Sequence, residues 1–174
     1  KTLKSGDPRD PQTVIGPVIN SQQAESLSAT VEQAVAEGAT ALVHGTTTDN
    51  LVEPSVLTGV PADSDLLRQE VFGPVAFLIP FDGEEEAVRI VNDTPYGLSG
   101  AVHTGDVERG VAFAKQIDTG MFHVNDGTVH DEPLVPFGGE KHSGIGRLNG
   151  ETTVESFTTM KWISVQHGRS GFPF

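Results

Sequence analysis

Residues 75–81 read Val-Ala-Phe-Leu-Ile-Pro-Phe, a continuous apolar run that only Pro80 interrupts. A run of this kind is typical of a strand that is buried on both faces, as in a parallel sheet. Because proline cannot donate to a sheet ladder, Pro80 is expected at the end of the strand. Residues 83–93 follow with the period of a helix, and its first turn is three glutamates, 84–86, which the helix dipole favours.

The same alternation of extended and helical segments continues on both sides of this run. Upstream, Asn20 or Ser21 can cap a helix that ends near Gly38 and turns one face inward, made of Ala24, Leu27, Val31, Ala34 and Val35. The remaining segments are strands at 40–44, 51–60, 98–103 and 120–125, a helix at 106–117 capped by Asp106, and a short helix at 151–157. With right-handed crossovers, this order predicts an α/β fold with a mostly parallel sheet and flanking helices.

Residues 158–166 form one more strand-like segment at the end of the chain. Its alternation places Met160 and Trp162 on one side and Ile163 and Val165 on the other. Because both sides carry apolar residues, we expect this terminal strand to need partners on both faces.

Composition excludes several classes of function. The chain has 11 Lys and Arg against 24 Asp and Glu, a net charge of −13, so nucleic acid and anionic membranes are not expected partners. It has no cysteine, which rules out disulfides and thiolate metal sites. No apolar run approaches the ~18 residues of a membrane span, and no signal peptide is visible, so the cytoplasm is the expected compartment.

Three motifs stand in order along the chain between residues 69 and 147. They are Gln69-Glu-Val-Phe-Gly-Pro74, Asn92-Asp-Thr-Pro-Tyr-Gly-Leu-Ser-Gly100 and Pro136-Phe-Gly-Gly-Glu-Lys-His-Ser-Gly-Ile-Gly-Arg147. A carboxylate placed just before an apolar strand is unusual unless it binds a donor, and it can accept both vicinal hydroxyls of a ribose. The third motif lies in a loop-like stretch, 126–150, and loops of that length in compact domains are functional or disordered.

Together these motifs resemble the aldehyde dehydrogenase family, over nearly the whole chain. The resemblance implies that Glu70 accepts hydrogen bonds from the nicotinamide ribose of NAD or NADP and that Phe72 lies against the nicotinamide. It implies that Phe137 is an apolar wall beside the aldehyde and that the 126–137 loop, with His130 and Asp131, belongs to the substrate pocket. Structural roles that fix the third motif follow for Lys141, Ser143 and Arg147.

In the family, the catalytic cysteine, the base and the oxyanion donor come earlier in the chain, so the resemblance implies no catalytic residue here. A thiolate is the nucleophile that this chemistry needs. We therefore expect a carboxyl-terminal fragment of an NAD(P)-dependent aldehyde dehydrogenase, inactive alone, that contacts the rest of its parent chain. The opening Lys1-Thr-Leu-Lys4, without an initiator methionine, agrees with this expectation.

The resemblance also divides the chain and suggests a substrate class. Residues 1–157 match the catalytic domain, and 158–174 match the family's terminal strand and tail, which implies a homo-oligomer, a dimer or a tetramer. The loop 125–139 and the closing residues 171–174 look most like enzymes for benzaldehyde, vanillin or salicylaldehyde. An aromatic aldehyde is therefore the expected substrate.

Two other functions remain open. The first is a free-standing, non-catalytic module that keeps the fold in order to bind or assemble; about 300 further upstream residues with a cysteine would favour the enzyme instead. The second is a metal hydrolase that uses a group of polar residues, namely His123, His130, Asp131, Glu132 and His142. Their spacing matches no helical ligand motif, so we predict no metal site. The glycines of 144–150 are spaced GxGxxxG, which does not match a dinucleotide-binding loop.

Overall fold

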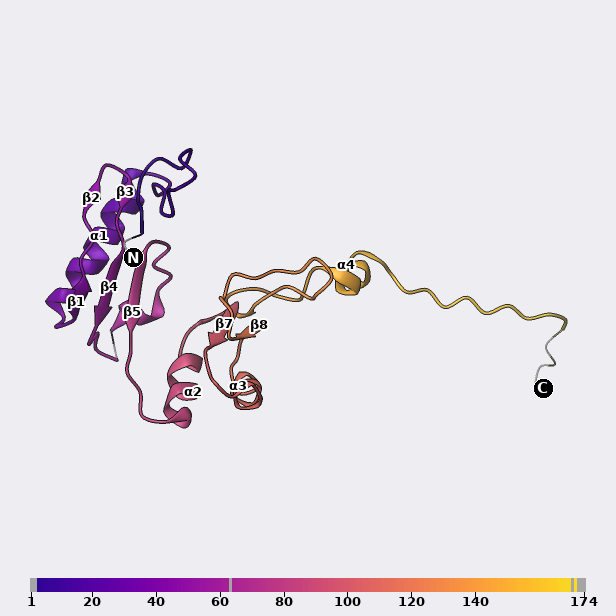
Figure 1. The fold of residues 1–174 in the computed structure, drawn as a ribbon. Helices are drawn as coiled ribbons and strands as arrows, with labels where there is room; N and C mark the ends of the chain where they lie inside the picture. Colours follow the sequence, from indigo (N-terminus) through magenta and orange to yellow (C-terminus); the bar gives the residue numbers. More distant parts are fainter. Residues whose placement is uncertain (1–2, 63, 170, 172–174) are drawn as a thin grey trace. The chain divides into compact units, whose positions relative to one another are not determined.

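The computed structural model describes residues 3–62, 64–169 and 171. It divides the chain into two compact units, Lys1–Ile90 and Val91–Phe174 (Figure 1). Helix α2, Glu84–Asn92, spans the boundary, and its first turn carries the three predicted glutamates. The domain boundary predicted after residue 157 coincides with the end of helix α4, Gly150–Phe157, and stays a prediction.

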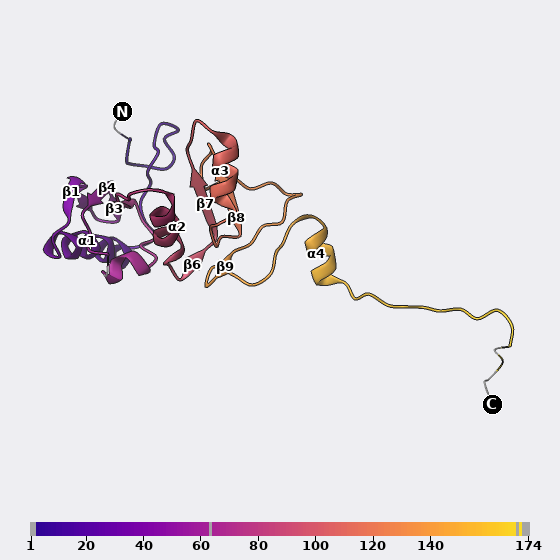
Figure 2. The same cartoon turned by 90° about the horizontal axis from the view of Figure 1, so that it is seen from below.

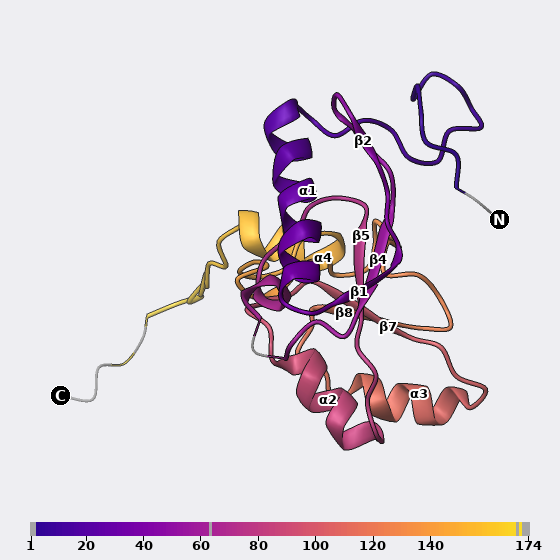
Figure 3. The ribbon, with the colours of Figure 1, turned by 90° about the vertical axis from the view of Figure 1, so that its left-hand side faces the viewer.

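The first unit is a small mixed sheet covered by one helix. Its strands run in the order β1 (Thr40–Val43), β4 (Ser55–Thr58) and β5 (Val75–Leu78). Strand β4 is antiparallel to β1 and parallel to β5. Helix α1, Ser21–Ala36, lies along this sheet (Figure 3). Side chains of the helix, the sheet, the 3₁₀ turn η1, Asp65–Arg68, and the link between α1 and β1 make the core, namely Val31, Ala34, Ala39, Leu57 and Leu66. A hairpin of β2, Thr47–Thr48, and β3, Leu51–Val52, completes the unit.

Helix α1 begins and ends where the sequence predicts. The Asn20 side chain accepts a hydrogen bond from the Gln23 backbone N–H at 2.9 Å, which satisfies one of the free amides of the first turn. Gly38, at φ +106°, follows the last turn in a conformation that suits glycine. Four of the five predicted core positions are buried, but Val35 is 43% exposed. Val35 lies one residue around the helix from Ala34, so it turns away from the stripe that faces the sheet.

The apolar run 75–81 forms a strand only over its first four residues. The strand pairs with β4 alone, so within the described residues it is an edge strand, and its residues are alternately half-buried and exposed. Ile79 and Phe81 lie beyond the strand and are exposed. The expectation of a strand buried on both faces is therefore wrong in this structure, because Val75 and Phe77 pack against the core whereas the face that carries Ala76 and Leu78 is exposed.

The second unit contains one complete strand–helix–strand crossover. Strands β7, Ser99–Val102, and β8, Met121–Val124, pair in parallel, and helix α3, Val107–Ala114, connects them (Figure 2). The Asp106 side chain caps α3 by accepting from the Arg109 backbone N–H at 3.0 Å, as predicted. The helix packs so close to the strand pair that Gly110 is buried and a Cβ there would stand only 2.7 Å from a methyl of Val124.

The prediction of a mostly parallel sheet has to be corrected. In the described part of the chain, two strand pairs are parallel and three are antiparallel; the antiparallel ones are β1·β4, β2·β3 and the pair of β6, Tyr96–Gly97, with β9, Glu140–Lys141. No helix separates β1 from β4, so the chain can reverse directly, and strands joined this way pair antiparallel. The content is therefore mixed α/β.

The predicted terminal strand is absent from the described residues. Residues 158–169 carry no helix or strand, and all of them are exposed. A strand requires a ladder partner, and the described part of this chain offers none to these residues. Of the closing motif 171–174, residues 172–174 lie outside the described residues. Among the described residues, no helix is both long and apolar enough to cross a bilayer.

Candidate functional site

Glu70 and Phe72 lie in the first unit, on the loop that connects η1 to β5. Both residues are exposed, and Phe72 is 74% exposed. The backbone of Phe72 has φ +52°, in the left-handed region. That conformation is uncommon for an aromatic residue and costs on the order of 1–3 kcal/mol, and it persists only where the surroundings enforce it.

Three contacts hold this loop against α1 and β4. The Gln23 amide donates to the carbonyl oxygens of Val71 at 3.3 Å and Phe72 at 3.2 Å. Gly73 lies so close to α1 that a Cβ on it would stand 2.4 Å from a methyl of Leu27. The Ser55 backbone N–H donates to the carbonyl of Pro74 at 2.9 Å. The aromatic ring is therefore presented outward on a fixed backbone.

The Glu70 carboxylate is open to ligands. It makes no hydrogen bond or ion pair with the part of the chain that the structure describes. Its neighbour two residues on is the exposed Phe72 ring. An unpaired carboxylate beside a flat apolar ring fits a ribose diol and a pyridine ring, which are the two groups that the nicotinamide half of a dinucleotide presents.

The third motif is fixed by side chains within the second unit. The Lys141 ammonium donates to the carbonyl of Asn92 at 2.8 Å, and the Ser143 hydroxyl accepts from the Gly97 backbone N–H at 2.9 Å. The Arg147 guanidinium donates to the carbonyl of Gly139 at 3.1 Å and pairs with the Glu140 carboxylate. These contacts confirm that Lys141, Ser143 and Arg147 have structural roles.

Close backbone packing explains the paired glycines of this motif. A Cβ on Gly120 would stand 1.7 Å from the carbonyl oxygen of Gly138, and a Cβ on Gly138 would stand 2.5 Å from that of Gly146. Beside them, Phe137 pairs with Leu148 through two backbone hydrogen bonds of 2.9 and 2.8 Å, and its side chain is partly buried.

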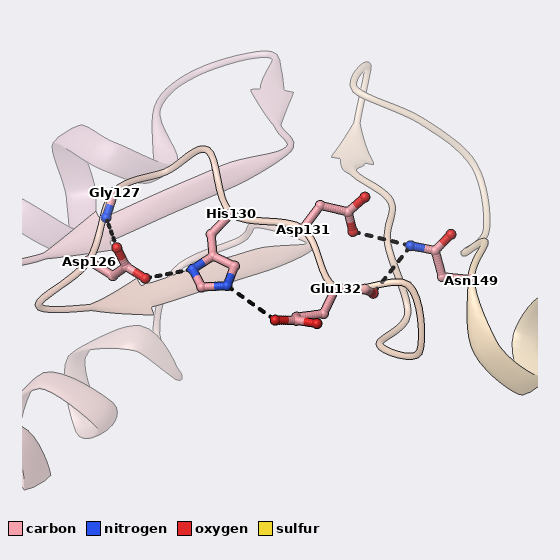
Figure 4. Close-up of polar contacts among 6 residues, drawn as sticks. All are labelled: Asp126, Gly127, His130, Asp131, Glu132 and Asn149. Carbon is pink, nitrogen blue, oxygen red and sulfur yellow. Dashed lines mark hydrogen bonds and ion pairs between the residues drawn. The ribbon is translucent and has the colours of Figure 1, made fainter.

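His130 lies between two carboxylates on the loop after β8 (Figure 4). Its Nδ1 is 2.7 Å from the Asp126 carboxylate, and its Nε2 is 3.6 Å from that of Glu132, a separation of an ion pair. The hydrogen bond with Asp126, and then the interaction with Glu132, raise the pKa of His130. The hydrogen bond from His130 lowers the pKa of Asp126. The loop therefore holds an imidazolium at neutral pH more readily than a free histidine would.

Asn149 ties the next part of the same loop to the start of α4. Its amide donates to the Asp131 carboxylate at 3.1 Å and to the carbonyl of Glu132 at 3.4 Å (Figure 4). Asp131 therefore has a fixed side chain, although it is exposed.

A cavity of about 420 Å³ opens beside this loop. His130 and Asp131 both line it, together with Asp126 and Glu132, whereas Phe137 is not part of the lining. Two of the three predicted substrate-pocket residues are therefore brought together. The third, Phe137, lies outside the lining, where its backbone is hydrogen-bonded to that of Leu148. Among the described residues, no group of three His, Cys, Asp or Glu side chains is arranged to hold a metal ion.

His123 also lines the cavity, from strand β8. Its ring is 6.0 Å from that of His130, centroid to centroid, with 14° between the planes. Its Nε2 is buried without a hydrogen-bond partner in the described part of the chain. His123 and His130 were grouped in the sequence only as possible metal ligands, not as stacked rings. The contacts of Gln23 and Asn149 could not be predicted, because they join residues 49 and 18 positions apart.

Known proteins of one family match nearly the whole of this chain. A sequence model of the Aldehyde dehydrogenase family matches residues 1–163. Benzaldehyde dehydrogenase YfmT from Bacillus subtilis is 58% identical over all 174 residues, which span 36% of its length. A vanillin dehydrogenase from Corynebacterium glutamicum is 45% identical over 95% of the chain and 34% of its own length.

Solved structures extend the match to three dimensions. The crystal structure of a salicylaldehyde dehydrogenase from Pseudomonas putida G7, complexed with salicylaldehyde, covers 99% of this chain and 36% of its own, with 32% identity and a TM-score of 0.91. Similar structures from Mycobacterium tuberculosis and Streptococcus pyogenes are complexed with NAD+ and with NADP+, respectively. The chain thus spans about a third of the length of the relatives that it matches, and it belongs to the aldehyde dehydrogenase family.

Proposed function

We propose that this chain forms the carboxyl-terminal part of an NAD(P)-dependent aldehyde dehydrogenase that oxidises an aromatic aldehyde to its carboxylic acid. Relatives named for benzaldehyde and vanillin, and a solved relative complexed with salicylaldehyde, support the aromatic substrate. The relatives match this chain over 34–36% of their length, so the activity belongs to a longer polypeptide.

The observation that carries the proposal is the Glu70–Phe72 loop. A left-handed phenylalanine with an exposed ring is strained, and the Gln23 and Gly73 contacts hold it in place. Next to it stands the unpaired carboxylate of Glu70. In this role Glu70 accepts the two ribose hydroxyls, and Phe72 supports one face of the nicotinamide. When bound, NAD(P)+ accepts the hydride that leaves the aldehyde carbon.

The loop 126–137 is the substrate side of the proposal. His130 and Asp131 line the cavity beside β8, and hydrogen bonds to Asp126 and Asn149 fix their side chains. Phe137, whose backbone pairs with that of Leu148, is the proposed apolar wall beside the aldehyde, although it does not line this cavity. These residues bind and orient the aldehyde, and they do no covalent chemistry.

The nucleophile must come from polypeptide outside this chain, which has no cysteine. An external thiolate would add to the aldehyde carbon, NAD(P)+ held at Glu70 and Phe72 would supply the hydride acceptor, and water would cleave the resulting thioester to acid and thiol. Positioning is the contribution of this chain, since hydride transfer depends on the distance and angle between donor carbon and nicotinamide.

Residues 158–166 are the proposed oligomer contact. Met160 and Trp162 are 99% and 91% exposed on a segment with no strand partner in the described chain. When the segment adds as a strand to the sheet edge of a second subunit, its backbone groups gain hydrogen-bond partners and its apolar side chains become buried.

Substitution of Glu70 tests the proposal most simply. The vehicle is a chimera in which this chain replaces the matching 36% of benzaldehyde dehydrogenase YfmT. Glu70→Gln keeps the size of the side chain but loses its charge and one acceptor. We expect hydride transfer to slow about tenfold, about 1.4 kcal/mol in the barrier, with a smaller change in NAD affinity, because the carboxylate acts on orientation.

Single-turnover kinetics measure the hydride step, and equilibrium titration measures NAD affinity. Glu25→Gln is the matched control, since Glu25 is an exposed glutamate on α1. An unchanged single-turnover rate in Glu70→Gln contradicts the role given to Glu70.

A further inference from the structure

We infer that Gln23 is a positioning residue, which holds Phe72 and Glu70 in the orientation that hydride transfer requires. The inference rests on the proposed function for the catalytic consequence, but not for the contact itself. It starts from one unusual feature, the φ of +52° at Phe72. A strained residue needs a partner that favours the strained conformation over the relaxed one.

Gln23 has the geometry of such a partner. One amide nitrogen donates to two successive carbonyl oxygens, those of Val71 at 3.3 Å and Phe72 at 3.2 Å. In extended backbone, the ordinary conformation of an aromatic residue, successive peptide groups point to opposite sides. A single nitrogen reaches both carbonyls only when the chain turns at Phe72. The two hydrogen bonds therefore occur together only in the turned state, and at least one of them is lost in the extended one.

Gln23 is itself held firmly. It lies in the first turn of α1, where its backbone N–H donates to the Asn20 cap at 2.9 Å. Its neighbour Ala24 is buried, and so is Leu27 one turn on, against which Gly73 packs. The first turns of α1 thus contact the loop at two successive points, through the Gln23 amide and through the Leu27 methyl groups. The position of the helix on its sheet sets the position of the Phe72 ring.

Without the Gln23 amide, the Gly73 and Pro74 contacts still hold the loop on the unit, but no hydrogen bond stabilises the positive φ of Phe72. The backbone at 71–72 then relaxes towards extended conformations, and the Phe72 ring and Glu70 carboxylate no longer share one orientation. Such a change lowers the rate of an oriented step more than it lowers affinity. We expect single-turnover hydride transfer to fall about tenfold in Gln23→Met, with the KM for NAD changed less than threefold.

The kinetic experiment uses the chimera with YfmT, four single variants and one double variant. Gln23→Met keeps the length of the side chain and removes both N–H donors. Gln23→Glu keeps its shape and replaces the donating amide nitrogen with a carboxylate oxygen. Gln22→Met is the control, since Gln22 is exposed on the same turn. Phe72→Gly is the background that tests the coupling, because glycine adopts positive φ without help. We expect Gln23→Met to slow the Phe72→Gly protein no further.

A second measurement does not depend on catalysis. Amide hydrogen exchange, followed by mass spectrometry in peptides that cover residues 69–75, should rise in Gln23→Met and Gln23→Glu and stay unchanged in Gln22→Met. Unchanged exchange at 69–75 in both Gln23 variants overturns the inference. So does an equal further loss of rate in the Phe72→Gly background. If the unsubstituted chimera oxidises no aldehyde, the proposed function fails, and the exchange measurement alone still decides for or against the clamp.

Discussion

At the scale of single residues, the charge of His130 affects the loop beside the cavity through its contacts with two carboxylates. Asp126 and Glu132 stabilise its protonated form, so the pairing is fully present below the ordinary pKa of histidine, 6.5, and is lost as pH rises through the raised pKa of His130. Asp126 has a lowered pKa, so the stability that its carboxylate contributes is present above pH 3.8 and is lost as pH falls through the lowered pKa. The loop is therefore most firmly held between these two ordinary values.

We predict that His130 titrates above 6.5 and that Asp126→Asn moves its pKa back down, because the hydrogen bond with Asp126 is the largest cause of the shift. The measurement is an NMR titration of the histidine ring signals in the 18.4 kDa chain. His167, which lies in the exposed segment after α4, is the internal reference. A His130 pKa that does not respond to Asp126→Asn contradicts the contact.

Residue roles could be anticipated only where a motif carries them. Lys141, Ser143 and Arg147 were expected to fix their loop, and their hydrogen bonds do so. The conformation of Phe72 was not predictable, because nothing in its local sequence favours a left-handed aromatic residue. The stabilising partner is Gln23, 49 positions away. From sequence, Gln23 is one more polar residue on an amphipathic helix.

At the scale of elements, helices were predicted better than strands. The caps of α1 and α3 depend on Asn20 and Asp106, which act within their own turn. Strand partners depend on the rest of the chain. The run 75–81 is apolar enough for a buried strand, yet within the described residues only four of its residues pair, and they pair with β4 alone. Hydrophobic pattern shows that a segment prefers burial, but not which chain supplies the cover.

The segment 158–166 extends the same reasoning to a testable case. Its apolar side chains alternate on both sides, and all are exposed in the described chain. We predict that Trp162→Lys in the chimera shifts the assembly from an oligomer towards the monomer, because a charge at a buried strand position is unpaired. Light scattering coupled to size exclusion measures the mass. His167→Lys is the control, since it adds the same charge outside the predicted strand. An unchanged mass in Trp162→Lys excludes this segment as the contact.

At the scale of the whole molecule, the chain builds two small units, not one large core. Within the described residues, the first unit has two hydrophobic clusters, around Leu57 and around Leu27. Large apolar side chains remain exposed on loops of the second unit, namely Val129, Leu134 and Ile145. Exposed apolar groups in this number favour cover by further polypeptide. They agree with a chain that spans 36% of the length of its relative YfmT.

The family could be identified from sequence because its motifs are long and lie in order. The mixture of parallel and antiparallel pairs could not be predicted from the sequence, because strands such as β6 and β9 have only two residues each and show no hydrophobic pattern. Substrate class stays a proposal, and so do the substrate-pocket roles of His130 and Asp131, because the chain spans only 34–36% of the length of these relatives.

The most direct measurement compares reduced nicotinamide formed from benzaldehyde and NAD by the chimera and by the 174-residue chain alone. The account predicts turnover by the folded chimera and none by the chain, since the thiolate lies outside it. Circular dichroism and NAD titration establish that the chimera is folded and binds cofactor. Aldehyde oxidation by the chain alone, or a folded, NAD-binding chimera with no turnover, would contradict the central claim.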